Sequence, residues 1–255
     1  MAAYDILGNI VLMKFFRDTK FAEKKKIANK FLREHKNVHT VLEKTSRLKG
    51  RLRTPGVKFI SGVRTSEVIY RENGCVFRFD VSSSYFSPRL STERAELARM
   101  IKKGESVLVL FGGVAPFAVV IAKTGKPSRV VSVELGKIPS KYAEMNVKAN
   151  KVNVQILQGD VRRLLPKMKD KFDRIIMTRP NLKDDFLDVS FKVARKGTII
   201  NYYGFYPEDS TNELIKLIEK RAMQAGRRIK ILNVKKAGDV GVRKFRYRAD
   251  FKIVS

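Results

Sequence analysis

The sequence predicts an α/β protein: a small N-terminal α+β region followed by a doubly wound, mainly parallel sheet that ends in an antiparallel hairpin. Three observations support this fold class. Between about residues 92 and 225, apolar strand-like segments alternate with helical segments, which is typical of a parallel sheet buried on both faces. Two strand-like segments without a helix between them close the chain. Short β-type segments separated by turn residues occupy residues 57–80.

The N-terminal region is expected to combine helices with a hairpin. From Phe15 to Leu42, apolar residues recur at helical spacing among many lysines, which predicts one or two amphipathic helices with a basic outer face. A basic, loop-like run then extends from Lys44 to Lys58, as suits contacts with phosphates. Strands are predicted at 57–61, 67–70 and 75–80, with Asn73–Gly74 as a hairpin turn. We therefore expect two domains, 1–80 and 81–255.

The second domain should start with a helix and then alternate strands with helices. The predicted helices cover 92–102, 116–124, 139–151, 183–194 and 211–225. The predicted strands cover 107–111, 129–135, 154–158, 172–177 and 198–204, followed by the closing pair 228–234 and 244–254. A parallel sheet closed by such a hairpin resembles the seven-stranded, Rossmann-like fold of class I methyltransferases.

Composition indicates a folded protein with a polyanionic partner. The 255 residues are 44% hydrophobic, and 54 Lys and Arg against 25 Asp and Glu give a net charge of +29. A charge of this size favours nucleic acid as the partner. The longest apolar runs, such as Val107–Phe111 and Phe117–Ala122, are too short to cross a bilayer, and Met1–Phe16 lacks the layout of a secretory signal. We expect a cytoplasmic protein without membrane contact and, although the sequence does not fix the oligomeric state, a monomer.

Metal binding is not expected. Cys75 is the single cysteine, so the chain can form neither an internal disulfide nor a cysteine-based zinc site. His35 and His39 are four residues apart, but no glutamate lies between them as the zinc-protease signature requires. We interpret both histidines as solvated polar positions.

The first predicted binding loop follows the strand at 107–111. In an open α/β sheet, ligands bind beyond the carboxyl ends of the strands. The loop Phe111–Phe117 contains Gly112 and Gly113 but has neither the spacing of a dinucleotide site nor the G-K-[ST] of a P-loop. It favours a cofactor without phosphates. The contacts expected from this loop are Phe111, Gly113, Pro116 and Phe117.

Three further signals follow on the next strand ends. Glu134 lies 21 residues after Gly113, about the offset at which a carboxylate accepts hydrogen bonds from a ribose. Gly159–Asp160 ends the next strand, where a carboxylate could receive an adenine amino group. The loop Thr178–Asn181 should face a reactive methyl group. The substrate contacts expected from it are Arg179, Pro180 and Asn181.

One segment carries a family resemblance. The residues Tyr85–Arg94 read YFSPRLSTER and, with Phe79–Val81, Phe111–Phe117 and Ile175–Met177, resemble the archaeal and eukaryotic tRNA (guanine-37-N1)-methyltransferases. The similarity covers about residues 47–209. It implies S-adenosylmethionine as the cofactor, and tRNA as the partner, with the methyl group placed on the purine 3′ of the anticodon.

The resemblance also implies residue roles. Glu93 would remove the N1 proton of guanine, which must leave before N1 can attack a methyl group, and Arg53 would stabilise the charge that develops on O6. Cofactor contacts are implied for Arg94, Glu134, Leu135, Asp160, Val161 and Thr178. Tyr85 and Arg89 would lie beside the pocket. Without the resemblance, Glu93 could simply favour the positive end of a helix dipole, and Arg94 could be a surface charge.

Two departures from the family bear on this reading. The family commonly has Asn-Leu-Pro where this chain has Thr178–Asn181, and a proline-rich variant there resembles an archaeal branch that also methylates carbon 7 of 4-demethylwyosine. The sequence leaves open whether one or two atoms are methylated. Ala115 stands where the family usually has glycine; we expect little effect, because alanine can occupy most backbone conformations.

Two alternative functions remain open. A sister family in wybutosine synthesis shares the fold and cofactor but transfers an aminocarboxypropyl group. An RNA-binding protein on a degenerate methyltransferase scaffold would bind tRNA without the cofactor. Under each of these functions the basic charge would serve to bind RNA. From Lys220 to Lys252 there are twelve basic residues and two acidic ones, Asp239 and Asp250. The closing hairpin could therefore form a second phosphate-binding face.

Overall fold

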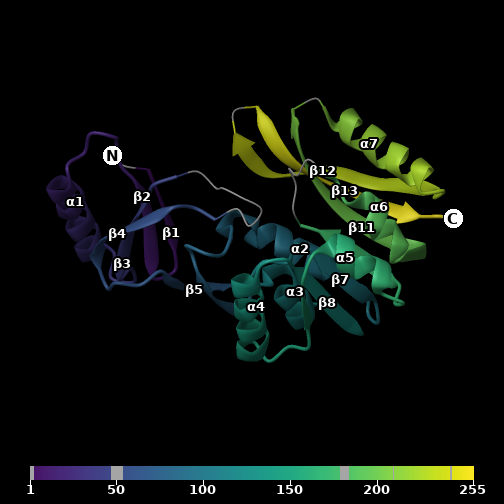
Figure 1. The fold of residues 1–255 in the computed structure, drawn as a ribbon, viewed down its shortest axis with the longest axis horizontal. Helices are drawn as coiled ribbons and strands as arrows, with labels where there is room; N and C mark the ends of the chain where they lie inside the picture. Colours follow the sequence, from purple (N-terminus) through teal and green to yellow (C-terminus); the bar gives the residue numbers. More distant parts are fainter. Residues whose placement is uncertain (1–2, 47–53, 179–183, 209, 242) are drawn as a thin grey trace.

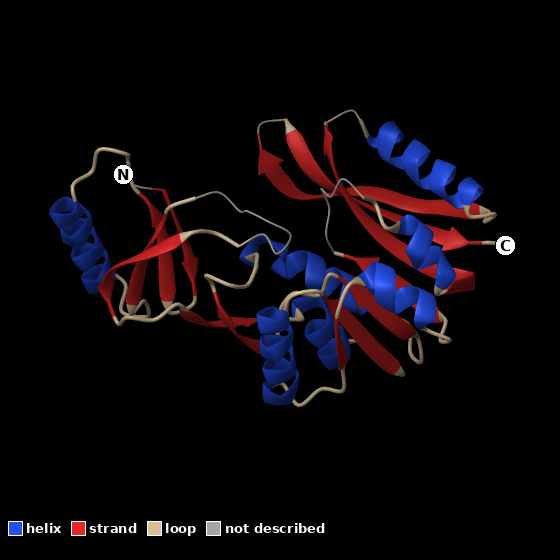
Figure 2. Cartoon of the chain, in the orientation of Figure 1, coloured by secondary structure: helices blue, strands red, loops and turns tan. Residues whose placement is uncertain are grey.

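The structure is a computed structural model, and it describes residues 3–46, 54–178, 184–208, 210–241 and 243–255. Figure 1 shows two lobes: a smaller N-terminal lobe with α1 and the first four strands, and a larger lobe built on a long twisted sheet. In Figure 2 helices lie on both sides of the larger sheet. The predicted fold class is therefore confirmed, since a seven-stranded mixed sheet ends in an antiparallel hairpin and follows a small α+β region.

The N-terminal lobe is a four-stranded sheet with one helix. Its strands are β1 (Ala3–Leu7), β2 (Ile10–Lys14), β3 (Thr40–Lys44) and β4 (Val57–Gly62), in that spatial order, and α1 (Phe21–Glu34) packs on β3 and β4. Of the one or two helices expected between Phe15 and Leu42, the structure has one, over Phe21–Glu34. The end of that stretch is wrong because Thr40, Val41 and Leu42 are buried in a strand parallel to β2, a pairing that outweighs the local helical spacing. The sequence reading also missed β1 and β2.

The larger sheet has the strand order β12-β13-β11-β10-β7-β8-β9. Its strands are β7 (Ser106–Leu110), β8 (Arg129–Glu134), β9 (Gln155–Gln158), β10 (Phe172–Met177), β11 (Ala194–Pro207), β12 (Ile229–Gly241) and β13 (Lys244–Ile253). Strands β7 to β11 run parallel, and β13 pairs antiparallel with both β11 and β12. The chain crosses from one half of the sheet to the other between β9 and β10, so the carboxyl ends of β7 and β10 lie at the switch point where ligands bind.

Helices cover both faces of this sheet. On one face lie α2 (Ser91–Met100), α3 (Pro116–Thr124) and α4 (Lys137–Ala149); on the other lie α5 (Val161–Leu164), α6 (Leu187–Lys192) and α7 (Thr211–Gln224). Two short 3-10 helices complete the chain, η1 (Pro88–Leu90) and η2 (Leu165–Lys167). Alternate strand residues enter the two cores: Val107 and Val109 face α2 and α3, whereas Leu108 and Leu110 face the other layer.

The helix predicted at 183–194 is shorter than expected. The side chains of Asp184 and Asp185 accept hydrogen bonds from the backbone N–H groups of Phe186 and Leu187, at 3.1 and 3.0 Å. Such local bonds compete with helix formation and delay its start to Leu187. At the other end Ala194 already pairs with Phe172 in the sheet.

A separate hairpin connects the two lobes. It consists of β5 (Glu67–Glu72) and β6 (Cys75–Asp80), and its turn residues Asn73 and Gly74 have φ of 48° and 69°, as a tight hairpin turn requires. The hairpin contacts β1 on one side and α4 on the other. The domain boundary at residue 80 therefore stays a prediction, because this hairpin packs against both lobes.

Two asparagines of α4 hold the backbone of β6. Asn150 accepts a hydrogen bond from Val76 N at 2.8 Å and donates to Val76 O at 2.7 Å. Asn146 repeats this pair with Arg78 N and O, at 2.7 and 3.1 Å. Four helical residues rise about 6 Å and two strand residues nearly 7 Å, so the two amide groups match successive outward backbone positions of the strand.

The other side of the hairpin depends on close backbone approach at Gly8. Its φ is +57°, and an added Cβ would lie 1.9 Å from the carbonyl oxygen of Ile69 in β5. The next residue, Asn9, accepts a hydrogen bond from Ile69 N at 2.7 Å and donates to Glu67 O at 3.2 Å. The turn between β1 and β2 is thus fixed directly to β5.

We predict that Gly8→Ala lowers the free energy of unfolding more than Gly74→Ala, measured by urea denaturation followed by circular dichroism. Both glycines have positive φ, which costs an alanine roughly 1–2 kcal/mol. Only at Gly8 does the new methyl group overlap another strand, which adds about 1–3 kcal/mol. Equal losses for the two variants would contradict a tight contact between this turn and β5.

Candidate functional site

Two adjoining cavities open at the carboxyl edge of the larger sheet. The first is a narrow cleft of about 80 Å³ between the loops after β7, β8 and β10 and the segment before α2. The second is a wider cavity of about 740 Å³ between the N-terminal lobe and the β12–β13 hairpin. The residues that line both are Tyr85, Phe86, Ser87 and Arg246. Ligand sites usually enclose about 300–1,000 Å³, so the cleft by itself is smaller than a typical site, whereas the adjoining cavity is within this range.

The loop after β7 forms the floor of the cleft. Gly112 donates its N–H to Val133 O at 2.9 Å, and a Cβ there would lie 2.1 Å from Ser132 Oγ, so a larger residue would displace the Ser132 side chain. Gly113 adopts φ +58° and lines the cleft. Ala115 also has a left-handed φ of +62°, which corrects the expectation that alanine is harmless here. This is the conformation that costs a residue with a Cβ roughly 1–2 kcal/mol.

Glu134 joins two of the loops that surround the cleft. One carboxylate oxygen accepts from Gly113 N at 2.8 Å and the other from Gly136 N at 2.7 Å, and the side chain lines the cleft. A carboxylate has about four acceptor positions, so two remain for a ligand. Glu134 therefore suits a pair of ribose hydroxyls.

Most of the predicted cofactor contacts meet in the cleft. Those that line it are Arg94, Phe111, Gly113, Pro116, Phe117, Glu134 and Thr178, together with the predicted substrate residue Tyr85. The Thr178 hydroxyl lies 3.0 and 2.9 Å from the carbonyl oxygens of Leu110 and Phe111, which fixes the end of β10 against the loop after β7. Arg89 lines the wider cavity instead.

Three predicted cofactor contacts lie at the next strand end but outside the lining of both cavities as far as the structure describes them: Leu135, Asp160 and Val161. Gly159 N donates to Glu134 O at 2.8 Å, so this loop adjoins the cleft. Asp160 accepts from Arg162 N at 2.9 Å as the N-cap of α5. The predicted residues Arg53, Arg179, Pro180 and Asn181 fall outside the described residues.

Arg94 is buried, not a surface charge. Its side chain is 1% exposed, pairs through Nε and Nη2 with both carboxylate oxygens of Glu72, and donates to Ser87 O at 3.0 Å. The guanidinium also lies over the rings of Phe86 and Phe117, 5.0 and 5.6 Å from their centroids. Arg94 thereby fixes the segment before α2 to the wall of the cleft.

Glu93 lies on the first turn of α2, inside a buried polar network. Its Oε1 accepts hydrogen bonds from Tyr203 at 2.7 Å and from Arg248 Nη1, while Lys235 Nζ lies 3.6 Å from Oε2. Burial, and then the adjacent Glu93 carboxylate, raise the pKa of Tyr203 well above its usual value, so the phenol stays a donor. Glu93 is not among the described residues that line either cavity.

The sequence reading missed Arg246 and Phe205. Arg246 lines both cavities, and its guanidinium lies 5.4 Å from the ring centroid of Phe205, its neighbour across β11 and β13. A signal was present in the strand at 244–254. Arg246, Arg248 and Asp250 alternate there with apolar residues, which places three charged side chains on one face of an otherwise buried strand.

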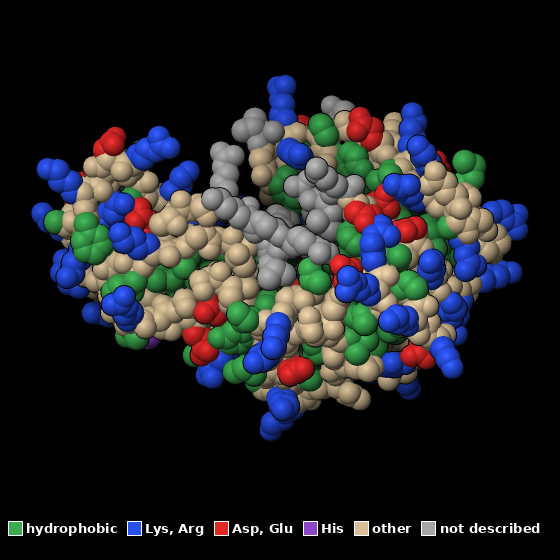
Figure 3. Space-filling model, viewed as in Figure 1, with side chains coloured by type: hydrophobic (Ala, Val, Ile, Leu, Met, Phe, Trp, Pro, Cys, Tyr) green, Lys and Arg blue, Asp and Glu red, His purple; other side chains and the backbone are tan. Residues whose placement is uncertain are grey.

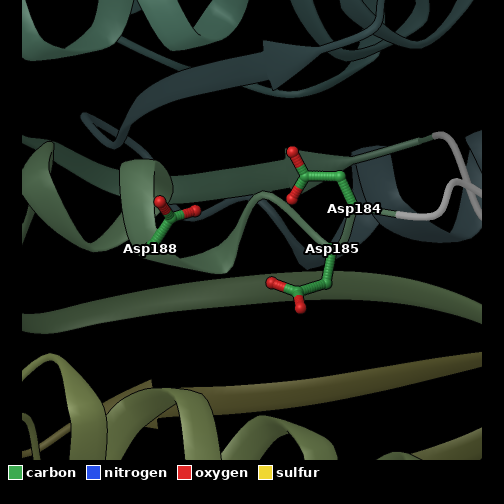
Figure 4. A group of neighbouring side chains, drawn as sticks. All are labelled: Asp184, Asp185 and Asp188. Carbon is green, nitrogen blue, oxygen red and sulfur yellow. The ribbon is translucent and has the colours of Figure 1, made fainter.

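A cluster of acidic side chains lies apart from both cavities. Figure 4 shows Asp184, Asp185 and Asp188 before and on the first turn of α6, with oxygens within 4.8 Å of one another. Arg162 pairs with Asp184 and Asp188, and Arg221 pairs with Asp185. The hydrogen bonds to Asp184 and Asp188 raise the pKa of Arg162. Arginines already neutralise these carboxylates, so the cluster gives no argument for a metal.

The surface is basic over both lobes. Figure 3 shows Lys and Arg side chains distributed across the N-terminal lobe and the larger lobe on the face in view. Within the part of the chain that the structure describes, no helix is both long and apolar enough to cross a membrane.

Comparisons with known proteins agree with this geometry. Residues 68–232 match the TRM5/TYW2 methyltransferase domain, and residues 1–65 match the TYW2 N-terminal domain. The chain is 35% identical to Trm5b, a tRNA (guanine(37)-N(1))-methyltransferase of Pyrococcus abyssi, over 98% of this chain and 74% of the relative. The crystal structure of that Trm5b superposes with a TM-score of 0.87, covering 99% of this chain and 75% of the other.

Two further relatives have other or additional activities. Taw22 of Nanoarchaeum equitans, named a tRNA (guanine(37)-N(1))/4-demethylwyosine(37)-methyltransferase, is 32% identical over 99% of this chain and 100% of its own. A tRNA(Phe) (4-demethylwyosine(37)-C(7)) aminocarboxypropyltransferase of Methanocaldococcus jannaschii is 30% identical over 78% of this chain and 77% of its own. Fold, cleft and sequence agree, and the chain belongs to the TRM5/TYW2 methyltransferase family.

Proposed function

We propose that this protein transfers a methyl group from S-adenosylmethionine to N1 of guanine 37 in tRNA. The observation that supports this most directly is the pair of adjoining cavities. One suits a cofactor that has a ribose but no phosphate, and the other is lined by basic and aromatic side chains. The basic residues of the wider cavity are Lys44, Arg89, Lys244 and Arg246. A nucleotide could enter between the two lobes and present its base to the cleft.

The cleft fits S-adenosylmethionine chemically. Glu134 keeps two acceptor positions for ribose hydroxyls, and Gly112 and Gly113 leave the backbone open to close approach. No P-loop motif provides for a phosphate. The cofactor would supply an electrophilic methyl group on a sulfonium. We assign its contacts to Arg94, Phe111, Gly113, Pro116, Phe117, Glu134 and Thr178, with Leu135, Asp160 and Val161 at the adenine end.

We assign proton removal from guanine N1 to Glu93. In the structure its Oε1 accepts from Tyr203 and Arg248, whereas Lys235 Nζ lies 3.6 Å from Oε2, beyond hydrogen-bond range. Oε2 is therefore the oxygen available to a proton, and the side chain has to turn toward the cavity to receive it. Arg53 would stabilise O6, and Tyr85, Arg89, Arg179, Pro180 and Asn181 would surround the base.

Charge supplies affinity for tRNA. The chain carries a net +29, and the wider cavity has basic side chains from both the N-terminal lobe and the hairpin. Counterions leave the RNA when phosphates are contacted, so binding should weaken steeply with added salt. Both lobes would then hold the anticodon region while the cleft acts on one base.

Relatives favour two related activities for the same site. Taw22 is named for both guanine 37 and 4-demethylwyosine 37, and it matches this chain over its whole length, which favours a second methylation on carbon 7 of the tricyclic base. The match of residues 1–65 to the TYW2 N-terminal domain and the similarity to an aminocarboxypropyltransferase favour the other transfer as the second candidate. The two differ in which bond to sulfur is broken.

We predict that the protein transfers methyl label, and no carboxyl label, to tRNA that carries guanosine or 4-demethylwyosine at position 37. Tritium in the methyl group and carbon-14 in the carboxyl group of the cofactor report the two transfers separately. Mass spectrometry of the nucleosides should then show 1-methylguanosine at position 37. Carbon-14 in the RNA would refute methyl transfer and indicate aminocarboxypropyl transfer. Binding of tRNA together with no affinity for S-adenosylmethionine in calorimetry would indicate a non-catalytic protein.

We predict that Glu93→Gln lowers turnover at least tenfold and leaves the dissociation constant of S-adenosylmethionine nearly unchanged. The amide cannot take up the N1 proton, and general-base catalysis typically contributes ~10²–10⁴-fold. Glu96→Gln is the matched control, because Glu96 also pairs with Lys235 and Arg248 but is one turn farther along α2. Similar rates for wild type and Glu93→Gln, or equal losses in both variants, would remove Glu93 as the base.

A further inference from the structure

Arg246 lies where the two cavities meet. It is 8% exposed, lines both the cleft and the wider cavity, and extends from β13 beside Phe205 of β11. The guanidinium lies 5.4 Å from the Phe205 ring centroid. Its Nε is buried and has no hydrogen-bond partner among the described residues.

An unpaired donor on a buried arginine is costly, because the guanidinium stays charged and leaves water. Arg248, two residues along the same strand, shows the usual solution. Its donors are matched by carboxylates of Glu93, Glu96 and Asp250. Arg246 lines two cavities instead, so a ligand there can supply the missing partner once the side chain turns its Nε toward the opening.

A second unpaired polar group lines the same wider cavity. Ser84, in the segment between β6 and η1, is 1% exposed, and its Oγ has no hydrogen-bond partner among the described residues. Two residues from different parts of the chain, each with a buried and unpaired polar atom, thus line one cavity. Its volume, about 740 Å³, lies in the range of small-molecule sites.

We propose that Arg246 binds the O6 and N7 edge of the target purine. Since the inference concerns the substrate of the same site, it rests on the proposed function. Gly113, in the loop after β7, and Glu134, at the end of β8, mark the cofactor side of the cleft. Arg246 lies on β13, beyond β11, on the side where the cleft opens to the wider cavity. Arginine donates in a fixed fork, and its commonest specific base contact is bidentate to guanine O6 and N7.

This edge leaves the reacting atom free. O6 and N7 lie on the edge of guanine next to the imidazole ring. N1 and the exocyclic N2 therefore remain open to the general base, Glu93, and to the methyl donor. In a tricyclic wyosine-type base the third ring spans N1 and N2, and both O6 and N7 persist. One arginine on this edge therefore recognises guanine and its tricyclic derivative alike, so Arg246 selects the purine without fixing which atom is methylated.

The test combines Arg246→Gln with tRNA transcripts that carry guanosine, 7-deazaguanosine or inosine at position 37. For the wild type we expect kcat/KM to fall on the order of tenfold when N7 is replaced by carbon. On the guanosine transcript we expect kcat/KM of Arg246→Gln to be lower than that of the wild type by a similar or larger factor. Replacing guanosine by 7-deazaguanosine should lower kcat/KM of the variant no further. Inosine, which keeps O6, N7 and N1 but lacks N2, should change both proteins by the same factor.

Controls separate this contact from other roles. Lys196→Gln, an exposed change at the opposite end of β11, should behave as wild type, and Arg246→Lys should keep the charge but lose the sensitivity to N7. Thermal melting and S-adenosylmethionine calorimetry report folding and cofactor binding. If Arg246→Gln does not fold, the effect of 7-deazaguanosine on kcat/KM is compared between the wild type and Arg246→Lys, and that comparison decides whether Arg246 contacts N7.

Two outcomes would overturn the proposal. Equal effects of the 7-deaza change in wild type and variant would show that Arg246 does not contact N7. Loss of cofactor affinity in Arg246→Gln without dependence on the base would assign Arg246 to the cofactor. If the wild type methylates none of the transcripts, the proposed function fails, independently of the role of Arg246. The dissociation constants of the guanosine and 7-deazaguanosine transcripts for wild type and Arg246→Gln then show whether Arg246 contacts N7.

Discussion

The buried charge of Arg248 is the constraint around which the larger lobe is arranged. This side chain lies in the middle of β13, 1% exposed, and a charge in that position is stable only when carboxylates surround it. Glu93 and Glu96 come from α2 and Asp250 from the same strand. The need to neutralise Arg248 therefore brings α2 against the closing hairpin and sets the position of the helix that carries Glu93.

The network continues across the sheet. Asp250 accepts a hydrogen bond from Asn201 on β11, and Asn201 accepts one from Arg174 on β10 at 3.3 Å. Arg174 in turn pairs with Glu105, just before β7. Buried polar groups of this kind are stable only when all are satisfied, so the chain of contacts couples α2, three strands and the residue before β7 into one unit. The cleft is built on the loops of that unit.

Much of the larger lobe could be predicted from sequence because its strands are short, apolar and separated by helices. Helix 116–124 and strand 172–177 were predicted to the residue. The N-terminal lobe was harder: Thr40–Leu42 fits a helical spacing, and only its pairing with β2 reveals a strand. In the site, loop residues such as Gly113 and Glu134 could be found from order alone. Arg246 was harder to find: the alternation of Arg246, Arg248 and Asp250 with apolar residues indicates one polar face of a buried strand, but not which of the three side chains lines a cavity.

The paired amides of Asn146 and Asn150 have a consequence for how this chain behaves among its copies. A two-stranded hairpin leaves two unsatisfied edges, and an open edge is a template for adding strands from another molecule. The amide groups of α4 occupy the outward N–H and C=O groups of Val76 and Arg78, in the place of a third strand. A helix thus closes the edge of β6 against the addition of another strand, and it does so with two buried, neutral side chains.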